Sequence, residues 1–181
     1  MRNTLLALTF GFLVAGSAQA GGHMKFQAQL EPFDLTGKPV LTTAQGMARV
    51  EVIDDGSALA FRVNVAGIEN LLMAHIHVAT DPVSVTDPAG PVAFWFTGGP
   101  PPGTNLTERV DGTLAEGYII TDGQLQVWDP TDPDAGTVAG LIGAILEGRA
   151  SVVVHTDDLN PDTPSGVAGD SRAGELRGTL R

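Results

Sequence analysis

The chain has 181 residues and a formal net charge of -11 at pH 7. This acidity argues against a nucleic-acid partner, because phosphate binding requires clustered Lys and Arg. The sequence contains no cysteine, which excludes zinc fingers, iron–sulfur clusters and thiolate copper sites of the blue-copper type.

Residues 1–20 have the pattern of a secretory signal peptide. Arg2 supplies the charged start, residues 5–14 form a short apolar stretch, and Ala18-Gln19-Ala20 provides the small residues of a cleavage site. The apolar stretch is too short to span a bilayer, and no later segment is long and apolar enough to do so. We therefore expect a periplasmic or secreted protein that begins near Gly21 and has no membrane span.

Cleavage after Ala20 would leave Gly21-Gly22-His23 at the mature N-terminus. The free amine, two deprotonated amides and the imidazole of His23 could then form a square-planar metal site, which Cu(II) and Ni(II) prefer. The alternative is a disordered tail that contains a histidine by chance.

The rest of the chain alternates between short apolar strands and turn-rich loops. Strands are predicted over residues 25–30, 46–53, 58–65, 71–78, 91–97, within 106–120, over 149–156 and over 175–181. Residues 137–147 form the one segment with helical spacing of apolar residues, which Thr137 or Asp134 could cap and Gly148 could end. The pattern predicts a single domain over residues 21–181, an all-β antiparallel sandwich with one short helix.

Three of the four histidines lie in two of these predicted strands, Ala74-His75-Ile76-His77 and Val152-Val153-Val154-His155. Side chains at i and i+2 of a strand share a face, so His75 and His77 point the same way. If the strand with His155 lies nearby, three imidazoles would form a metal site for copper or zinc. The alternative for each histidine is a buried side chain that is satisfied by hydrogen bonds.

Other residues could complete such a site. Ligand histidines normally donate their second ring N–H to an acceptor, for which Asp157, Asp158 or backbone carbonyls are candidates. Met24, Met47 and Met73 could add soft ligands for Cu(I), or they could fill space in the core.

The order of these motifs resembles the CHRD domain, the module named after chordin. The resembling segments are Ala74-His75-Ile76-His77, residues 90–94, the helix with Gly148, residues 152–156 and residues 174–180, which together span about residues 25–181. CHRD domains are similar in turn to Cu,Zn superoxide dismutase. The resemblance therefore implies a Greek-key β-sandwich with copper ligands at His75, His77 and His155.

The chain departs from that enzyme in two ways that bear on function. Residues 79–90 contain no histidine, whereas the enzyme has a bridging histidine and further zinc ligands there, so copper is expected rather than zinc. The enzyme's catalytic arginine precedes the last strand, where this chain has Arg172, although Gly174 or Glu175 falls closer in register.

Three functions are compatible with these features. The first is a copper-binding protein that binds, buffers or delivers the ion outside the cytoplasm. The second is a copper-only, superoxide dismutase-like oxidoreductase in which Arg172 or Arg177 guides the anion, so whether the protein is an enzyme stays open. The third is a metal-free module that binds a protein partner or matrix through Trp95, Trp128 and the triproline loop; a homodimer is also compatible with the sequence.

Overall fold

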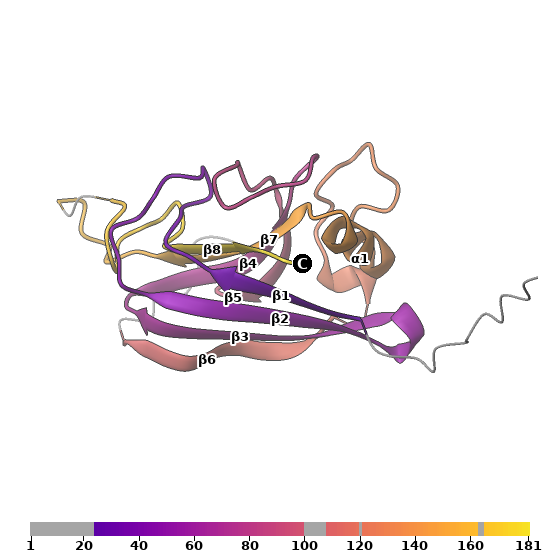
Figure 1. Ribbon diagram of the computed structural model, residues 1–181, viewed down its shortest axis with the longest axis horizontal. Coiled ribbons are helices and arrows are strands. Elements are labelled where there is room, and N and C mark those ends of the chain that lie inside the picture. The colour runs from indigo at the N-terminus through magenta and orange to yellow at the C-terminus, as the bar shows by residue number, and fades with distance from the viewer. Residues whose placement is uncertain (1–23, 100–107, 120, 163–164) are drawn as a thin grey trace, which may run out of the picture.

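Two four-stranded antiparallel sheets stack face to face in the computed structural model, which describes residues 24–99, 108–119, 121–162 and 165–181 (Figure 1). Sheet A has the strand order β1-β2-β3-β6, and sheet B has the order β5-β4-β7-β8. The elements are β1 Lys25–Leu30, β2 Gln45–Ile53, β3 Ala58–Ile68, β4 Leu71–Val78, β5 Val92–Thr97, β6 Val110–Ile119, α1 Val138–Leu146, β7 Ala150–Thr156 and β8 Leu176–Thr179. The predicted antiparallel sandwich with one short helix is confirmed.

The ends of the elements differ slightly from the prediction. Strand β3 continues to Ile68 instead of ending at Val65, because the turn into β4 is made by the next two residues, with Asn70 in the left-handed region at φ 52°. The predicted hairpin after β2 contains a short 3-10 turn, Asp54–Gly56. Helix α1 begins after Thr137, whose Oγ1 accepts a hydrogen bond of 2.9 Å from the Gly140 amide, as expected for an N-cap.

The hydrophobic core lies between the two sheets and extends under α1. Sheet B contributes alternate residues of its central strands, among them Ile76 of β4 and Val152 and Val154 of β7, each 0% exposed. The intervening residues of the same strands must therefore face the other way. That outer face of sheet B carries the three histidines.

One edge of the sandwich is joined by hydrogen bonds between β1 and β8. Glu31 and Arg177 exchange two backbone bonds of 2.8 Å, and Gln27 and Arg181 exchange two more, of 2.8 and 3.0 Å. A Cβ atom at position 178 would lie 2.2 Å from the carbonyl oxygen of Gln29, so only glycine allows the two strands to approach so closely. This contact fixes β8, and with it Arg177, against the rest of sheet B.

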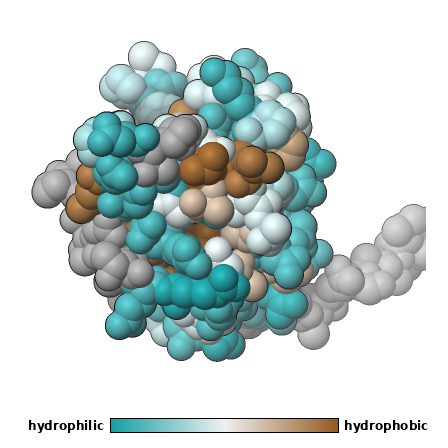
Figure 2. Space-filling view, turned by 90° about the vertical axis from the view of Figure 1, so that its left-hand side faces the viewer, coloured by the Kyte–Doolittle hydropathy of each residue, from teal (hydrophilic) through white to brown (hydrophobic). Residues whose placement is uncertain are grey.

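Three loops cover the outer face of sheet B: residues 31–44, residues 79–91, and the described residues between β7 and β8, 157–162 and 165–175 (Figure 1). Backbone hydrogen bonds connect them, since the Leu35 amide donates to Ala173 O at 2.6 Å and the Ala89 amide donates to Leu35 O at 2.9 Å. Figure 2 views the end of the sandwich where the first and third loops gather. That end is mostly hydrophilic, with one group of hydrophobic side chains near its middle.

Among the described residues, no helix combines the length and apolar character needed to cross a membrane.

Candidate metal centre

Three histidines converge on the covered face of sheet B. His75 and His77 lie on β4 and His155 lies on the neighbouring strand β7, and their side chains are only 2%, 5% and 3% exposed. One ring nitrogen of each lies within 4.8 Å of the other two. The three-histidine hypothesis required the strand bearing His155 to lie near the strand bearing the other two histidines, and the pairing of β4 with β7 meets this condition.

Backbone carbonyls determine which nitrogens of two of these rings are free. His77 Nδ1 lies 2.7 Å from Gly90 O, and His155 Nδ1 lies 2.6 Å from Arg172 O. A carbonyl oxygen can only accept, so both Nδ1 atoms carry the hydrogen and both Nε2 atoms keep a lone pair. These two Nε2 atoms and His75 Nδ1 are buried and have no hydrogen-bond partner among the described residues. Each ring thus presents one unsatisfied nitrogen.

Burial keeps the imidazoles neutral. It lowers the pKa of His75 to about 2, with smaller contributions from the positive charges that His155 and His77 would carry. Burial likewise lowers the pKa of His155 to about 4, and it lowers the pKa of His77. At neutral pH all three rings can therefore act as nitrogen ligands without first losing a proton.

This donor set fits a metal ion. A buried polar atom without a partner typically costs about 1–3 kcal/mol, and three of them at one place need an explanation. Three neutral imidazoles are suitable ligands for copper or zinc, and they leave a coordination position open.

Gly90 holds His77 in place through a backbone conformation that other residues rarely adopt. Its φ is +82°, and a Cβ atom there would lie 2.3 Å from Val78 O. Backbone carbonyls, one of the predicted alternatives, thus bind the second nitrogen of His77 and of His155. Nothing in the residue types of the sequence identified the carbonyls of Gly90 and Arg172, because any residue carries a carbonyl.

The side chain of Arg172 lies on the surface and is paired. Its Nε lies 2.6 Å from Asp157 Oδ2, and the side chain is 66% exposed. Carboxylate oxygens of Asp157, Asp158 and Asp170 lie within 4.8 Å of one another, and burial together with the charges of the other two raises the pKa of Asp170. The Arg172 guanidinium thus offsets part of an acidic cluster next to the histidine strand.

Arg177 is buried, so it does not offer the exposed guanidinium that guidance of an anion requires. The side chain is 0% exposed, and its Nη1 donates to the carbonyl oxygens of Val85, at 3.3 Å, and Asp87. Its Nε and Nη2 have no hydrogen-bond partner among the described residues. Local sequence could not reveal this burial, because it results from loop 79–91 folding over β8.

The remaining predicted residues fall in three places. Trp95 of β5 packs its ring edge-on against His75, with centroids 4.6 Å apart, and Trp128 is 5% exposed, so neither forms a freely exposed surface. His23, the signal peptide and most of the triproline loop lie outside the described residues. Their predicted roles stay predictions.

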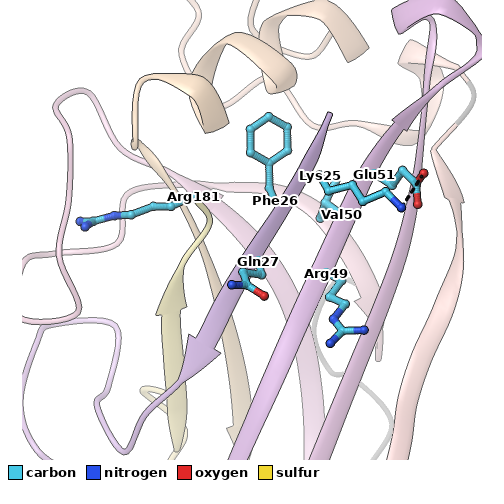
Figure 3. A pocket seen from close by; sticks show the side chains of 7 residues that line it. All are labelled: Lys25, Phe26, Gln27, Arg49, Val50, Glu51 and Arg181. Atoms are coloured by element: carbon cyan, nitrogen blue, oxygen red, sulfur yellow. Dashed lines mark ion pairs between the residues drawn. The ribbon is translucent and has the colours of Figure 1, made fainter. Parts of the chain in front are cut away.

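A surface hollow lies away from the histidines, over β1 and β2 (Figure 3). It is lined by Lys25, Phe26, Gln27, Arg49, Val50, Glu51 and Arg181. Lys25 pairs with Glu51 at 3.4 Å, while the side chains of Arg49 and Arg181 extend in different directions. These cationic groups do not converge on a common point.

Comparison with curated proteins gives no match to this chain. A scan against protein families matches the CHRD domain over residues 26–163. The match includes all but the first residue of β1, strands β2 to β7 and both histidine segments, so it covers the elements that bring the three histidines together. The chain belongs to the CHRD domain family.

Proposed function

We propose that the three-histidine centre binds copper and that the protein binds, buffers or delivers the ion outside the cytoplasm. The observation that carries the proposal is the set of three unsatisfied imidazole nitrogens, His75 Nδ1, His77 Nε2 and His155 Nε2, on one buried face. CHRD domains are typically extracellular, which agrees with the signal peptide predicted for residues 1–20.

Copper is favoured over zinc by the composition of the donor set. Affinities of nitrogen sites for divalent ions peak at copper, so a site of three neutral imidazoles takes copper in preference to zinc when both are available. The carboxylates of Asp157, Asp158 and Asp170 form a group of their own, so the donor set at the histidines consists of imidazole nitrogens. Bound copper would supply a redox-active Lewis acid.

The protein's own groups orient the ligands and keep water away. The carbonyls of Gly90 and Arg172 hold two of the rings, and the three loops over sheet B leave each histidine at most 5% exposed. Preformed rings lose little conformational entropy on metal binding, which favours affinity.

The test is copper titration followed by dialysis and metal analysis. It is best done with a His23→Ala variant, because a Gly21-Gly22-His23 terminus could itself bind Cu(II). We expect one copper ion to be retained per chain, and we expect a second substitution, His155→Ala, to abolish retention while circular dichroism shows an intact β-sandwich. Retention that is unaffected by loss of both His75 and His77 would refute the proposal.

The other two functions make different predictions in the same experiment. A folded protein that retains no metal would favour the metal-free partner-binding module. For the dismutase-like activity, the exposed Arg172 is the remaining candidate guide, although Asp157 already pairs with it. Dismutation by the copper-loaded protein that is no faster than free copper would rule that activity out.

A further inference from the structure

The covered face of sheet B carries two more residues that bear on the oxidation state of a bound copper ion. We propose that the site holds copper as Cu(I), with Met73 as a fourth ligand and Arg177 as a positioning residue whose charge disfavours Cu(II). This inference rests on the copper site proposed above. It needs no redox step, because the ion would be taken up already reduced.

Met73 lies beside the three histidines. It precedes His75 by two positions on β4, and the register places it directly opposite His155 on β7. Such cross-strand partners share a face and have Cβ atoms about 4.5–5.5 Å apart. Met73 is 8% exposed, yet it is not among the residues of the core between the sheets. It is therefore buried on the histidine face.

The neighbouring strand leaves room for this side chain. Next to Met73 the chain after β5 has Gly98, at φ +83°, and a Cβ atom there would lie 2.8 Å from the Cβ of Met73. The backbone therefore approaches Met73 without a competing side chain. A methionine side chain has three flexible torsions, so its thioether can reach a nearby metal, and thioethers select Cu(I).

Arg177 brings a permanent charge to the same face. The register places Arg177 opposite Val153, which is itself opposite His75, so all three point to the same side of sheet B. No carboxylate lies within ion-pair distance of Arg177 in the described part of the chain. The nearest negative charges that affect its guanidinium are those of Asp87 and Asp34, which interact with it without a direct ion pair.

Because Arg177 is buried on the face that carries the histidines, its positive charge repels a metal cation bound there. The repulsion grows with the charge of the ion, so it is stronger for Cu(II) than for Cu(I). Three imidazoles and a thioether are all neutral, and they contribute no negative charge that would favour the divalent ion. The charge of Arg177 and the neutral ligand set therefore both favour Cu(I) over Cu(II).

Arg177 also positions a ligand. Its Nη1 donates to the carbonyls of Val85 and Asp87 in loop 79–91, and the same loop contains Gly90, whose carbonyl orients His77. A substitution of Arg177 could therefore act through its charge or through this loop, and an experiment must separate the two.

The first experiment measures the affinities for Cu(I), by competition with a chromophoric chelator, and for Cu(II), in the His23→Ala protein. We expect Met73→Leu to weaken Cu(I) binding by about tenfold or more and to leave Cu(II) binding within about threefold, since only the thioether is lost. Met47→Leu, on the outer face of sheet A, is the matched control and should change neither affinity. Cu(I) affinity of Met73→Leu within about twofold of the parent would overturn the role of Met73.

The second experiment compares Arg177→Met with Arg177→Lys by the copper midpoint potential. Loss of charge in Arg177→Met should lower the preference for Cu(I) by about tenfold, which is about 59 mV for a one-electron couple. Arg177→Lys keeps the charge and should keep the potential. Equal decreases in both variants would overturn the electrostatic role, and if either fails to fold, the Met73 comparison still decides whether the site selects Cu(I).

These outcomes are separable from the failure of the copper site itself. If His155→Ala binds Cu(I) and Cu(II) as tightly as the parent does, then the proposed function fails, whatever the results for the Met73 and Arg177 variants. If His155→Ala loses copper but Met73→Leu and Arg177→Met behave like the parent, then only the selection of Cu(I) fails.

Discussion

The outer faces of the two sheets differ in solvent exposure. In sheet A, β1 alternates between exposed and buried residues, as expected for a strand with one face in water. In sheet B, β7 is buried at every position and β4 at every position except Leu72. The difference arises because three loops cover sheet B. Polar groups on sheet A can therefore bind water, whereas those on sheet B must find partners within the protein or in a ligand.

The polar groups buried on sheet B or in the loops beside it include satisfied and unsatisfied ones. Glu175 is 0% exposed, and its carboxylate accepts from Thr42 Oγ1 at 2.6 Å, Thr156 Oγ1 at 2.8 Å and the Gly169 amide at 2.8 Å. By contrast, each of the three histidines keeps a buried nitrogen without a partner among the described residues. The first arrangement holds the loops in place, and the second suits a ligand.

Acidification tests this contrast most strongly. Unfolded histidine has a pKa near 6.5, whereas the pKa in the fold is about 4 for His155 and about 2 for His75. Below pH 6.5 the unfolded chain binds protons that the native protein does not, so the free energy of unfolding decreases as the pH falls. We expect these two residues to remove about 4 kcal/mol between pH 7 and 5 in the metal-free protein, measured by urea unfolding.

The control for this pH dependence is a variant without one of the buried rings. His155→Phe should show a shallower decrease between pH 7 and 5, because one fewer proton is taken up on unfolding. An unfolding free energy of the parent that is constant over this interval would show that the rings are not held neutral in the fold.

Removal of the Glu175 carboxylate should have the next largest effect. Glu175→Ala leaves three donors without their acceptor, and we expect it to destabilise the fold by about 3 kcal/mol, measured by chemical denaturation. The matched substitution on sheet A is Glu116→Ala, which removes an exposed carboxylate instead of a buried one. Equal losses from the two glutamates would contradict the contrast between the sheets.

Gly90→Ala should reduce stability by about 2 kcal/mol, because alanine is strained at positive φ and its Cβ would clash with the backbone. The same change should displace the carbonyl that holds His77 and weaken copper binding. Thermal unfolding and copper titration measure the two effects. Gly56→Ala, at φ +94° with no atom within 4 Å of an added Cβ, is the control for backbone strain alone. It should leave copper affinity unchanged.

The smallest effect is expected on the outer face of sheet A. Glu116 pairs with Arg62 at 3.3 Å, and both side chains are more than half exposed, at 62% and 55%. Such pairs contribute about 0.2–1 kcal/mol, so Glu116→Ala should change the unfolding free energy by less than about 1 kcal/mol. If the loss of unfolding free energy caused by Glu116→Ala becomes smaller at high salt, this will confirm that solvent ions screen the pair.

Local sequence determined which side chains share a face and where helix α1 begins and ends. The shared direction of His75 and His77 follows from strand alternation alone, and the cap at Thr137 and the end of α1 follow from residue types. Family resemblance added the expectation that His155 completes the set. These features could be predicted because they depend on neighbours in the chain or on a recurring motif.

Only the tertiary structure decided which face of each sheet is covered. Arg177 lies in a strand that could equally well face solvent, and its burial depends on a loop that folds back from residues 79–91. The partnership of Met73 with His155 depends on the register between two strands far apart in the chain. Periodicity sets the direction of a side chain relative to its neighbours, but pairing register and loop packing are non-local, and they decide whether that direction ends in water, in the core or at a metal site.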